Sequence, residues 1–457
     1  MNRIAGRAGI TLLLVLFLLA GFGFFVAEFV LNARDWVIFP GSPHIYNGGN
    51  IGCGVVTDSD GVLLLDLDTE SRVYADNDLL RMATVHWLGD RTGSISAPAL
   101  SRYAGELAGF ELLGGVYSYG QTGGVAELTF SARVQAAALE AMGDHKGTVG
   151  IYNYKTGELI CAVTTPTYDP DNVPDLSSDT EGKYEGMYLN RFIQSVYIPG
   201  SIFKIVTLAA ALEEDPSIAE QTFVCSGTYQ IGDNEIVCEG AHWEQSLKEA
   251  FRNSCNCAFA QIAQSLGPEK MERYVRQFQI TDSVTFDGIT TARGNYDVSD
   301  ASEVNFAWSA IGQYTDQINP CRFMTFLGAI ANDGKGTVPH LVNKITVDGA
   351  RTYSSVTGSE QRIMSTRTAQ LIQEYLLNNV ETKYGSENFP GLTVGAKTGT
   401  GEVGGGRRPN ATFAGLVDDV KYPYAFIVVV EDGGYGSTVC IPILSKILEA
   451  CRMYLSE

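Results

Sequence analysis

The apolar positions near the start of the chain form one unbroken run. No residue from 10 to 27 is charged, and the 24 residues from 8 to 31 contain only Glu28. A helix of that length rises roughly 36 Å, which is enough to cross a bilayer. Arg3 and Arg7 precede the run, which predicts a cytoplasmic N-terminus and a membrane anchor over residues 1–33, with the rest of the chain outside. A cleaved signal peptide is the alternative, although its apolar region is usually only about 7–15 residues long.

The next part of the chain, residues 34–145, carries short and mixed patterns. Residues 34–50 are rich in Pro, Gly and Asn and are expected to form a linker. Beyond them, the pattern predicts strand–turn–strand at 54–67 and a helix at 96–110. Residues 125–142 begin as a strand and continue as a helix. We therefore expect a linker followed by a small, pedestal-like α/β module, to which the sequence assigns no chemistry.

The pattern becomes clearer over residues 146–457. Two apolar strands flank a turn at Lys155-Thr156-Gly157, and three more strands follow one another near the C-terminus. Helices are expected at 199–214, 246–267 (with a break near 253–256), 365–380 and 445–455. Strands at both ends around a helical block predict an α+β fold, with an antiparallel sheet flanked by helices.

The net charge of the chain limits the classes of molecule that it can bind. It has 52 acidic against 32 basic residues and a net charge of -20, and the first 40 residues contribute three basic and two acidic groups. The acidity therefore belongs to the part outside the membrane. An acidic surface repels phosphate, so nucleic acid is not expected as a partner. With 45% hydrophobic residues the chain is not a disordered one.

The nine cysteines form no C-x-x-C pair, and none has a histidine at zinc spacing, so no metal site and no cofactor is expected. Cys225 and Cys238 bracket a strand–turn–strand pattern that could place them side by side. A disulfide between them is a candidate in an oxidising exterior, and two free thiols are the alternative.

Two short motifs place a serine beside a possible proton carrier. Ser201 and Lys204 are three residues apart at the start of a helix, where free backbone N–H groups can hold a developing negative charge. The hydroxyl of Ser201 can attack a carbonyl if Lys204 is neutral and accepts its proton. Ser254 and Asn256 lie at the expected helix break, where the hydroxyl can relay a proton and the amide can hold a substrate carbonyl.

A third motif, Lys397-Thr398-Gly399-Thr400, lies on an expected strand. Its ammonium and hydroxyl groups can bind a carboxylate, and Gly399 lets another backbone approach closely. The second K-T-G string, 155–157, occupies a hairpin turn. There glycine is favoured by backbone conformation and the polar side chains are solvated, so we expect it to be structural.

The order S-x-x-K, S-x-N, K-T-G resembles that of the penicillin-binding proteins. Residues 188–213 (YLNRFIQSVYIPGSIFKIVTLAAALE) and 147–172 (GTVGIYNYKTGELICAVTTPTYDPDN) are similar to segments of that family. The resemblance covers 125–457 well and 50–125 loosely. One apolar run and no glycosyltransferase-sized module point to class B, the monofunctional transpeptidases. The chain departs from the family pattern at Gly312-Gln313-Tyr314, Asn319-Pro320-Cys321 and Thr412-Phe413.

The resemblance implies a serine-acyltransferase fold of the penicillin-binding and β-lactamase type, and a peptidoglycan D,D-transpeptidase. Ser201 would attack the penultimate D-Ala carbonyl of a stem peptide, and an acceptor amine would resolve the acyl-enzyme. The backbone N–H groups of Ser201 and Thr400 would form the oxyanion hole. β-Lactams would acylate the same serine. Lipid-linked precursor and a SEDS-type glycosyltransferase in the membrane are the implied partners.

Two alternatives share the fold. A β-lactamase or β-lactam sensor would need a carboxylate for the deacylating water, and Glu374 begins an E-x-x-L-N string. That glutamate is expected on the solvated face of a capped helix, which argues against the role. A non-enzymatic scaffold for wall assembly is the second alternative, and the three intact motifs argue against it. A role in elongation, division or sporulation is left open.

Overall fold

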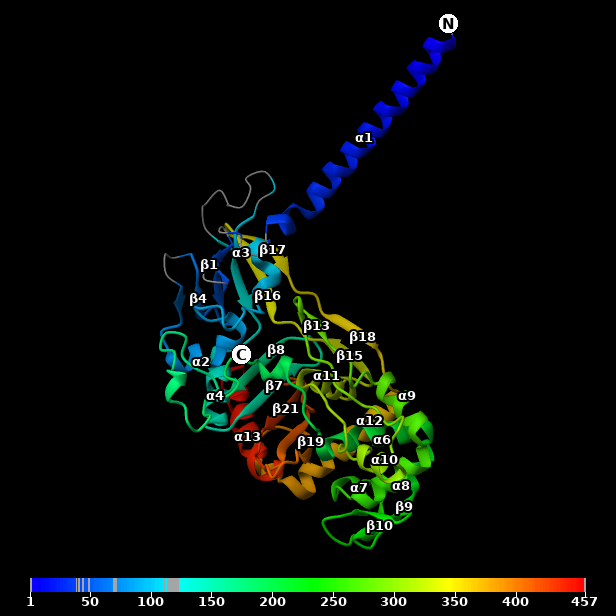
Figure 1. Ribbon diagram of the computed structural model, residues 1–457. Helices are drawn as coiled ribbons and strands as arrows, with labels where there is room; N and C mark the ends of the chain where they lie inside the picture. The colour runs from blue at the N-terminus through cyan, green and yellow to red at the C-terminus, as the bar shows by residue number, and fades with distance from the viewer. Residues whose placement is uncertain are drawn as a thin grey trace.

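A long N-terminal helix leaves the body of the protein in the computed structural model (Figure 1). The described residues are 2–37, 39, 42, 45–47, 50–68, 72–110, 112 and 123–455. Helix α1 (Asn2–Val37) contains a stretch, Gly6–Ala33, with mean hydropathy 2.7 that is long and apolar enough to cross a membrane. The helix continues into the expected linker 34–50, and most of residues 38–49 lies outside the described part of the chain.

A five-stranded antiparallel sheet is the centre of the molecule. Its order is β19-β20-β21-β7-β8. The strands are β7 (Gly147–Asn153), β8 (Leu159–Thr165), β19 (Val394–Gly401), β20 (Asn410–Val417) and β21 (Tyr424–Val430). The pairing of β21 with β7, with Tyr424 opposite Asn153, joins the two ends of the predicted α+β unit. The predicted antiparallel sheet is therefore confirmed, with β19 at its edge.

Helices cover both faces of this sheet, because its strands are apolar on both sides. One face packs against α2 (Asp78–Leu88), α4 (Ala132–Met142) and α13 (Gly436–Tyr454). The other face packs against α6 (Lys204–Glu214), α11 (Pro320–Ala331) and α12 (Thr366–Asn379). Ser365 caps α12 through its hydroxyl, as the sequence predicts.

A second sheet of six strands forms the N-terminal module, in the order β17-β16-β6-β3-β4-β5. Its strands are β3 (Val55–Thr57), β4 (Leu63–Asp66), β5 (Val73–Tyr74), β6 (Val125–Leu128), β16 (Val342–Val347) and β17 (Ala350–Ser354). β3 runs parallel to β6, whereas β16 runs antiparallel to it. Two strands from far along the chain thus complete the sheet of the N-terminal module.

The helix expected at 96–110 is much shorter in the structure. Only η1 (Ser101–Tyr103) and α3 (Ala104–Leu107) are helical. Pro98 disfavours a helical conformation at Ala97, and residues 98–100 form a turn in which the Ala97 carbonyl accepts from the N–H groups of Leu100 and Ser101.

A helical lobe with short hairpins lies at the opposite end from α1 (Figure 1). Its elements are η3 (Gly200–Phe203), η4 (Pro216–Glu220), β9 (Thr222–Cys225), β10 (Thr228–Ile231), β11 (Asn234–Val237), β12 (Trp243–Ser246), α7 (Leu247–Arg252), α8 (Asn256–Leu266), α9 (Pro268–Gln277) and α10 (Glu303–Ser309). The remaining short elements are β1 (Tyr46–Asn47), β2 (Asn50–Ile51), η2 (Leu176–Ser178), α5 (Arg191–Gln194), β13 (Thr285–Phe286), β14 (Ile289–Thr290), β15 (Lys335–Val338), β18 (Gly358–Arg362), η5 (Val380–Tyr384) and η6 (Ser386–Asn388). The break expected within 246–267 is confirmed between α7 and α8.

Candidate active site

Ser201 lies in the tight turn η3, which rests directly on strand β19. Gly200 makes this approach possible. Its φ is +58°, its N–H donates to the Gly312 carbonyl at 2.8 Å, and a Cβ on it would collide with the Thr400 carbonyl. Gly399 on β19 is equally confined, since a Cβ there would meet the Pro199 carbonyl. The two glycines therefore hold the serine against the strand of the third motif.

Lys204 is the first residue of α6 and is fully buried. Its Nζ lies 3.1 Å from Ser201 Oγ, 2.7 Å from Asn256 Oδ1, 2.6 Å from the Ser254 carbonyl and 3.2 Å from Ser254 Oγ. An ammonium group has only three N–H bonds for these four acceptors. Burial lowers the pKa of Lys204 to about 8, while the nearby Cys238 and Cys255 act in the opposite direction. Lys204 can therefore become neutral near physiological pH and accept a proton from Ser201.

Ser254 connects the two lysines of the site. It occupies the break between α7 and α8 with a φ of +57°, a conformation that non-glycine residues seldom adopt. Its Oγ accepts from Lys397 Nζ at 2.9 Å and lies 3.2 Å from Lys204 Nζ. This unusual backbone conformation places a hydroxyl between two buried amines, where it can pass a proton.

Lys397 projects from β19 into the same cluster and is fully buried. Its Nζ also donates to the Thr398 carbonyl at 2.9 Å. Burial lowers the pKa of Lys397 well below its usual value, and the charges of Lys204 and Lys383 lower it further. The structure thus brings Ser201, Lys204, Ser254, Asn256 and Lys397 together around one point.

The edge of β19 next to the site is held by two side chains that the motifs do not include. Tyr384 Oη lies 3.0 Å from Thr398 Oγ1 and accepts from the Thr398 N–H at 3.2 Å. Gln313 donates from Nε2 to the Thr400 carbonyl at 3.0 Å and accepts from the Glu402 N–H at 3.2 Å. The sequence offers only the departure at 312–314 as a sign of Gln313, and no sign of Tyr384.

Gln313 also lines a groove on the surface of the protein. It has a volume of about 440 Å³. Its lining residues are Asn305, Trp308, Gln313, Tyr314, Glu402 and Gly404. Gln313 belongs both to the groove and to the hydrogen bonds of β19, so a ligand in the groove would lie beside Thr400.

The competing motif residues lie elsewhere. Lys155 occupies the exposed turn between β7 and β8, as expected, and donates to Asn332 Oδ1 at 2.8 Å. The side chain of Glu374 is 59% exposed on α12 and pairs with Lys248 at 2.8 Å. Neither residue contacts the serine cluster.

The structure decides between the two alternatives for Cys225 and Cys238, and one statement about the histidines needs correction. Cys225 and Cys238 are free thiols, so the candidate disulfide is not formed. Cys225 ends β9 and pairs with β12, whereas the sulfur of Cys238 faces Cys255 at 3.9 Å. The expectation that no histidine stands at zinc spacing is wrong. His242 follows Cys238 by four residues, and its Nδ1 lies 3.6 Å from the Cys238 sulfur.

Comparison with known proteins gives a consistent assignment. The family model "Penicillin binding protein transpeptidase domain" matches residues 147–449. The peptidoglycan D,D-transpeptidase PbpA of Mycolicibacterium smegmatis is 28% identical over 337 residues, which cover 68% of each chain.

Solved structures agree with the fold. Penicillin-binding protein A from M. tuberculosis, in a ceftriaxone acyl-enzyme complex, superposes with a TM-score of 0.75 at 24% identity, covering 87% of this chain and 98% of the other. A structure described as the structural coordination of polymerization and crosslinking by a peptidoglycan synthase complex has a TM-score of 0.63 at 23% identity. It covers 72% of this chain and 63% of the other.

Proposed function

Because the chain belongs to the penicillin-binding protein transpeptidase domain family, we propose that Ser201 is its acylated nucleophile and Lys204 the base that activates it. The protein is a serine-type peptidoglycan D,D-transpeptidase that crosslinks stem peptides and is acylated by β-lactams. The observation that carries the residue assignment is the 3.1 Å distance from Ser201 Oγ to the Nζ of Lys204, which is fully buried.

Acylation begins when neutral Lys204 takes the proton of Ser201. The serine oxygen then attacks the carbonyl of the penultimate D-Ala, and the bond to the terminal D-Ala breaks. Ser254, between the two lysines, passes the proton to the departing amine. An acceptor amine from a second stem peptide attacks the resulting ester, and the proton returns to the serine along the same route.

Negative charge develops on the carbonyl oxygen during each attack. The Thr400 carbonyl accepts a hydrogen bond from the Gln313 side chain, which shows that this carbonyl points away from β20. In an antiparallel strand the N–H and C=O of one residue point to the same side, so the Thr400 N–H is directed away from β20 as well. Together with the N–H of Ser201, it is suited to hold the oxyanion. The edge of β19 along which the substrate peptide lies consists of Thr398, Gly399 and Thr400. Lys397 attracts the carboxylate of that peptide.

The test is labelling of the full-length protein in detergent with a fluorescent penicillin, followed by mapping of the modified peptide. We expect the label on Ser201, and none on Ser201→Ala. The sequence contains one other S-x-N string of this kind, Ser386-Glu387-Asn388, so Ser386→Ala is the matched control and should label normally. A label on any peptide that lacks Ser201 would refute the assignment.

The wider arrangement rests on the sequence pattern. We propose an anchor over 1–33 with a cytoplasmic N-terminus, a linker and pedestal module over 34–145, and a transpeptidase domain over 146–457. A SEDS-type glycosyltransferase is proposed as the membrane partner that supplies glycan strands from lipid-linked precursor. The likeness of the fold to a chain of a peptidoglycan synthase complex supports such a partner. Protease protection of the N-terminus in sealed inverted vesicles would contradict the orientation, and co-purification in native membranes tests the partner.

A further inference from the structure

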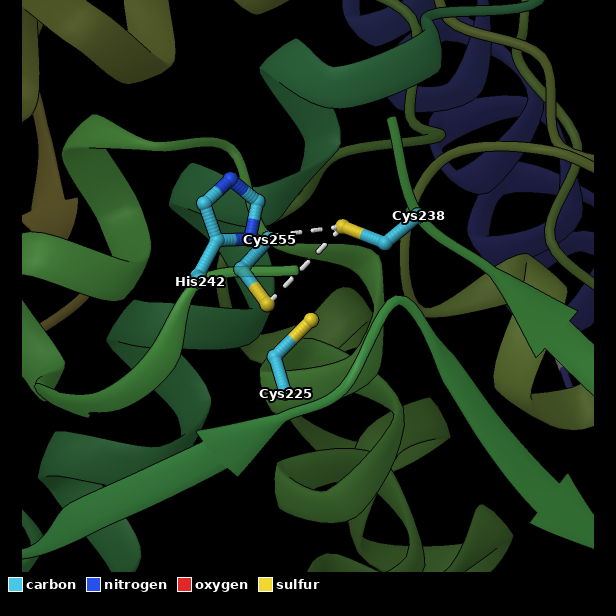
Figure 2. Close-up of side chains that lie close together, drawn as sticks. All are labelled: Cys225, Cys238, His242 and Cys255. Atoms are coloured by element: carbon cyan, nitrogen blue, oxygen red, sulfur yellow. Dashed lines mark hydrogen bonds between the residues drawn. The ribbon is translucent and has the colours of Figure 1, made fainter. Parts of the chain in front are cut away.

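Four side chains from the ends of four elements point toward one another in the helical lobe (Figure 2). Cys225 ends β9, Cys238 follows β11, His242 precedes β12, and Cys255 is the N-cap residue of α8. Their three sulfur atoms and one ring nitrogen all lie within 4.8 Å of one another. Cys225 and Cys255 are fully buried, and Cys238 is 9% exposed.

The spacing of these atoms matches a tetrahedral metal site. With Zn–S bonds of about 2.3 Å and Zn–N bonds of about 2.0 Å, tetrahedral angles place two sulfurs about 3.8 Å apart and a sulfur and a nitrogen about 3.5 Å apart. Cys238 Sγ lies 3.9 Å from Cys255 Sγ and 3.6 Å from His242 Nδ1. A disulfide would require about 2.0 Å. The cluster therefore has room for an ion between its members.

We propose that Cys225, Cys238, His242 and Cys255 bind one Zn²⁺ ion in a closed, structural Cys₃His site. Three thiolates and an imidazole are the donors that zinc favours over harder cations. On binding, each thiol that is still protonated releases its proton to water, and no change of oxidation state is involved. Backbone amides already face two of the sulfurs, Asn256 N–H toward Cys238 at 3.3 Å and Ala258 N–H toward Cys255 at 3.4 Å.

The hairpin strands beside the cluster bury few side chains of their own. In the strands β9 to β12 most side chains are exposed, and the buried apolar ones besides Cys225 are Phe223, Ile231 and Ile236. Such small hairpins commonly depend on a metal or a disulfide for stability. A zinc ion would tie the ends of β9, β11 and β12 to the start of α8.

The zinc site would also hold two residues of the catalytic cluster in position. This step rests on the proposed function. Cys255 lies between Ser254 and Asn256, and Asn256 donates from Nδ2 to the Val237 carbonyl at 2.8 Å, next to Cys238. Asn256 Oδ1 in turn accepts from Lys204. Zinc would therefore fix the turn that presents Ser254 and Asn256 to Lys204, which makes the four ligands positioning residues.

The experiment is metal analysis of the full-length protein, purified in detergent under anaerobic, reducing conditions. We expect about one zinc per chain. Replacement by Co²⁺ should give the visible absorption bands of a tetrahedral, thiolate-rich site. His242→Ala should bind zinc about tenfold or more weakly. Cys440→Ala is the matched control, because it removes a buried free thiol from α13, in the core on the other face of the central sheet, and it should keep the metal.

Positioning is tested by the rate of penicillin acylation in the same variants. His242→Ala should acylate about 10- to 100-fold more slowly. His242→Cys supplies a fourth thiolate and should restore both zinc and rate, which loss of a purely local packing contact would not allow. Protein without stoichiometric metal, or with a Cys225–Cys238 or Cys238–Cys255 disulfide by mass spectrometry, would overturn the proposal. If zinc is absent but Ser201 is labelled, the zinc site is refuted while the proposed function stands. If zinc is bound but Ser201 is not labelled, the proposed function is refuted while the zinc site stands.

Discussion

Replacing Lys397 with methionine separates the catalytic value of this residue from its cost to the fold. Methionine has a similar length and no charge, so the variant loses the two hydrogen bonds from Nζ, to Ser254 Oγ and to the Thr398 carbonyl, each 2.9 Å long. Ser254 then keeps only Lys204 as an amine neighbour. The variant also removes the cation expected to attract the substrate carboxylate.

Lys397→Met should lower the acylation rate but should not lower the stability of the fold. A hydrogen bond from a charged donor contributes about 1.5–3 kcal/mol, which corresponds to an acylation rate about 10- to 160-fold lower. Burial lowers the pKa of Lys397 well below 10.5. At neutral pH the protonated side chain is therefore better solvated in the unfolded chain, so burying it lowers the free energy of unfolding. Without the amine, the free energy of unfolding should stay equal or rise.

The assay is the second-order rate of labelling by fluorescent penicillin, measured beside a chemical denaturation curve. Lys155→Met is the matched control, because it removes the lysine of the second K-T-G string from an exposed turn. It should leave the labelling rate unchanged. Equal rates in both variants would refute the role of Lys397, and a Lys397→Met protein that loses stability as well as rate would show that the residue is structural.

Three further outcomes follow from the site. The acylation rate should rise with pH and level off above about 8. Burial lowers the pKa of Lys204 to about 8, and only the neutral amine accepts the proton of Ser201. A flat rate profile from pH 6 to 9 would contradict this role. Gly200→Ala should abolish labelling while circular dichroism is retained, since its φ is +58° and a Cβ would push the turn off Thr400. The penicilloyl adduct should persist for many minutes, because Glu374 is exposed and paired with Lys248, and rapid release of penicilloic acid would favour a β-lactamase.

Local patterns account for what the sequence predicts well. The strand of Lys397, the helix that starts at Lys204 and the break at Ser254 each follow from residues within one short segment. The helix predicted at 96–110 is shorter in the structure because Pro98 disfavours a helical conformation at Ala97 and a turn precedes Ser101. The sequence contains His242 four residues after Cys238, yet Cys225 and Cys255 join them only through the pairing of β9 with β12 and the start of α8. Such convergence depends on tertiary contacts and has no local signature.

The six-stranded sheet of the N-terminal module has a mechanical consequence. Strand β6 lies between β3, near residue 55, and β16, near residue 345, so its ladder is shared by both parts of the chain. A fragment that starts at residue 146 would leave β16 with an open edge, prone to pairing with other chains. In the intact protein a force on one part reaches the other through the hydrogen bonds of this ladder. The described strands near residues 55 and 345 are therefore coupled through backbone hydrogen bonds to one shared strand, in addition to the covalent chain.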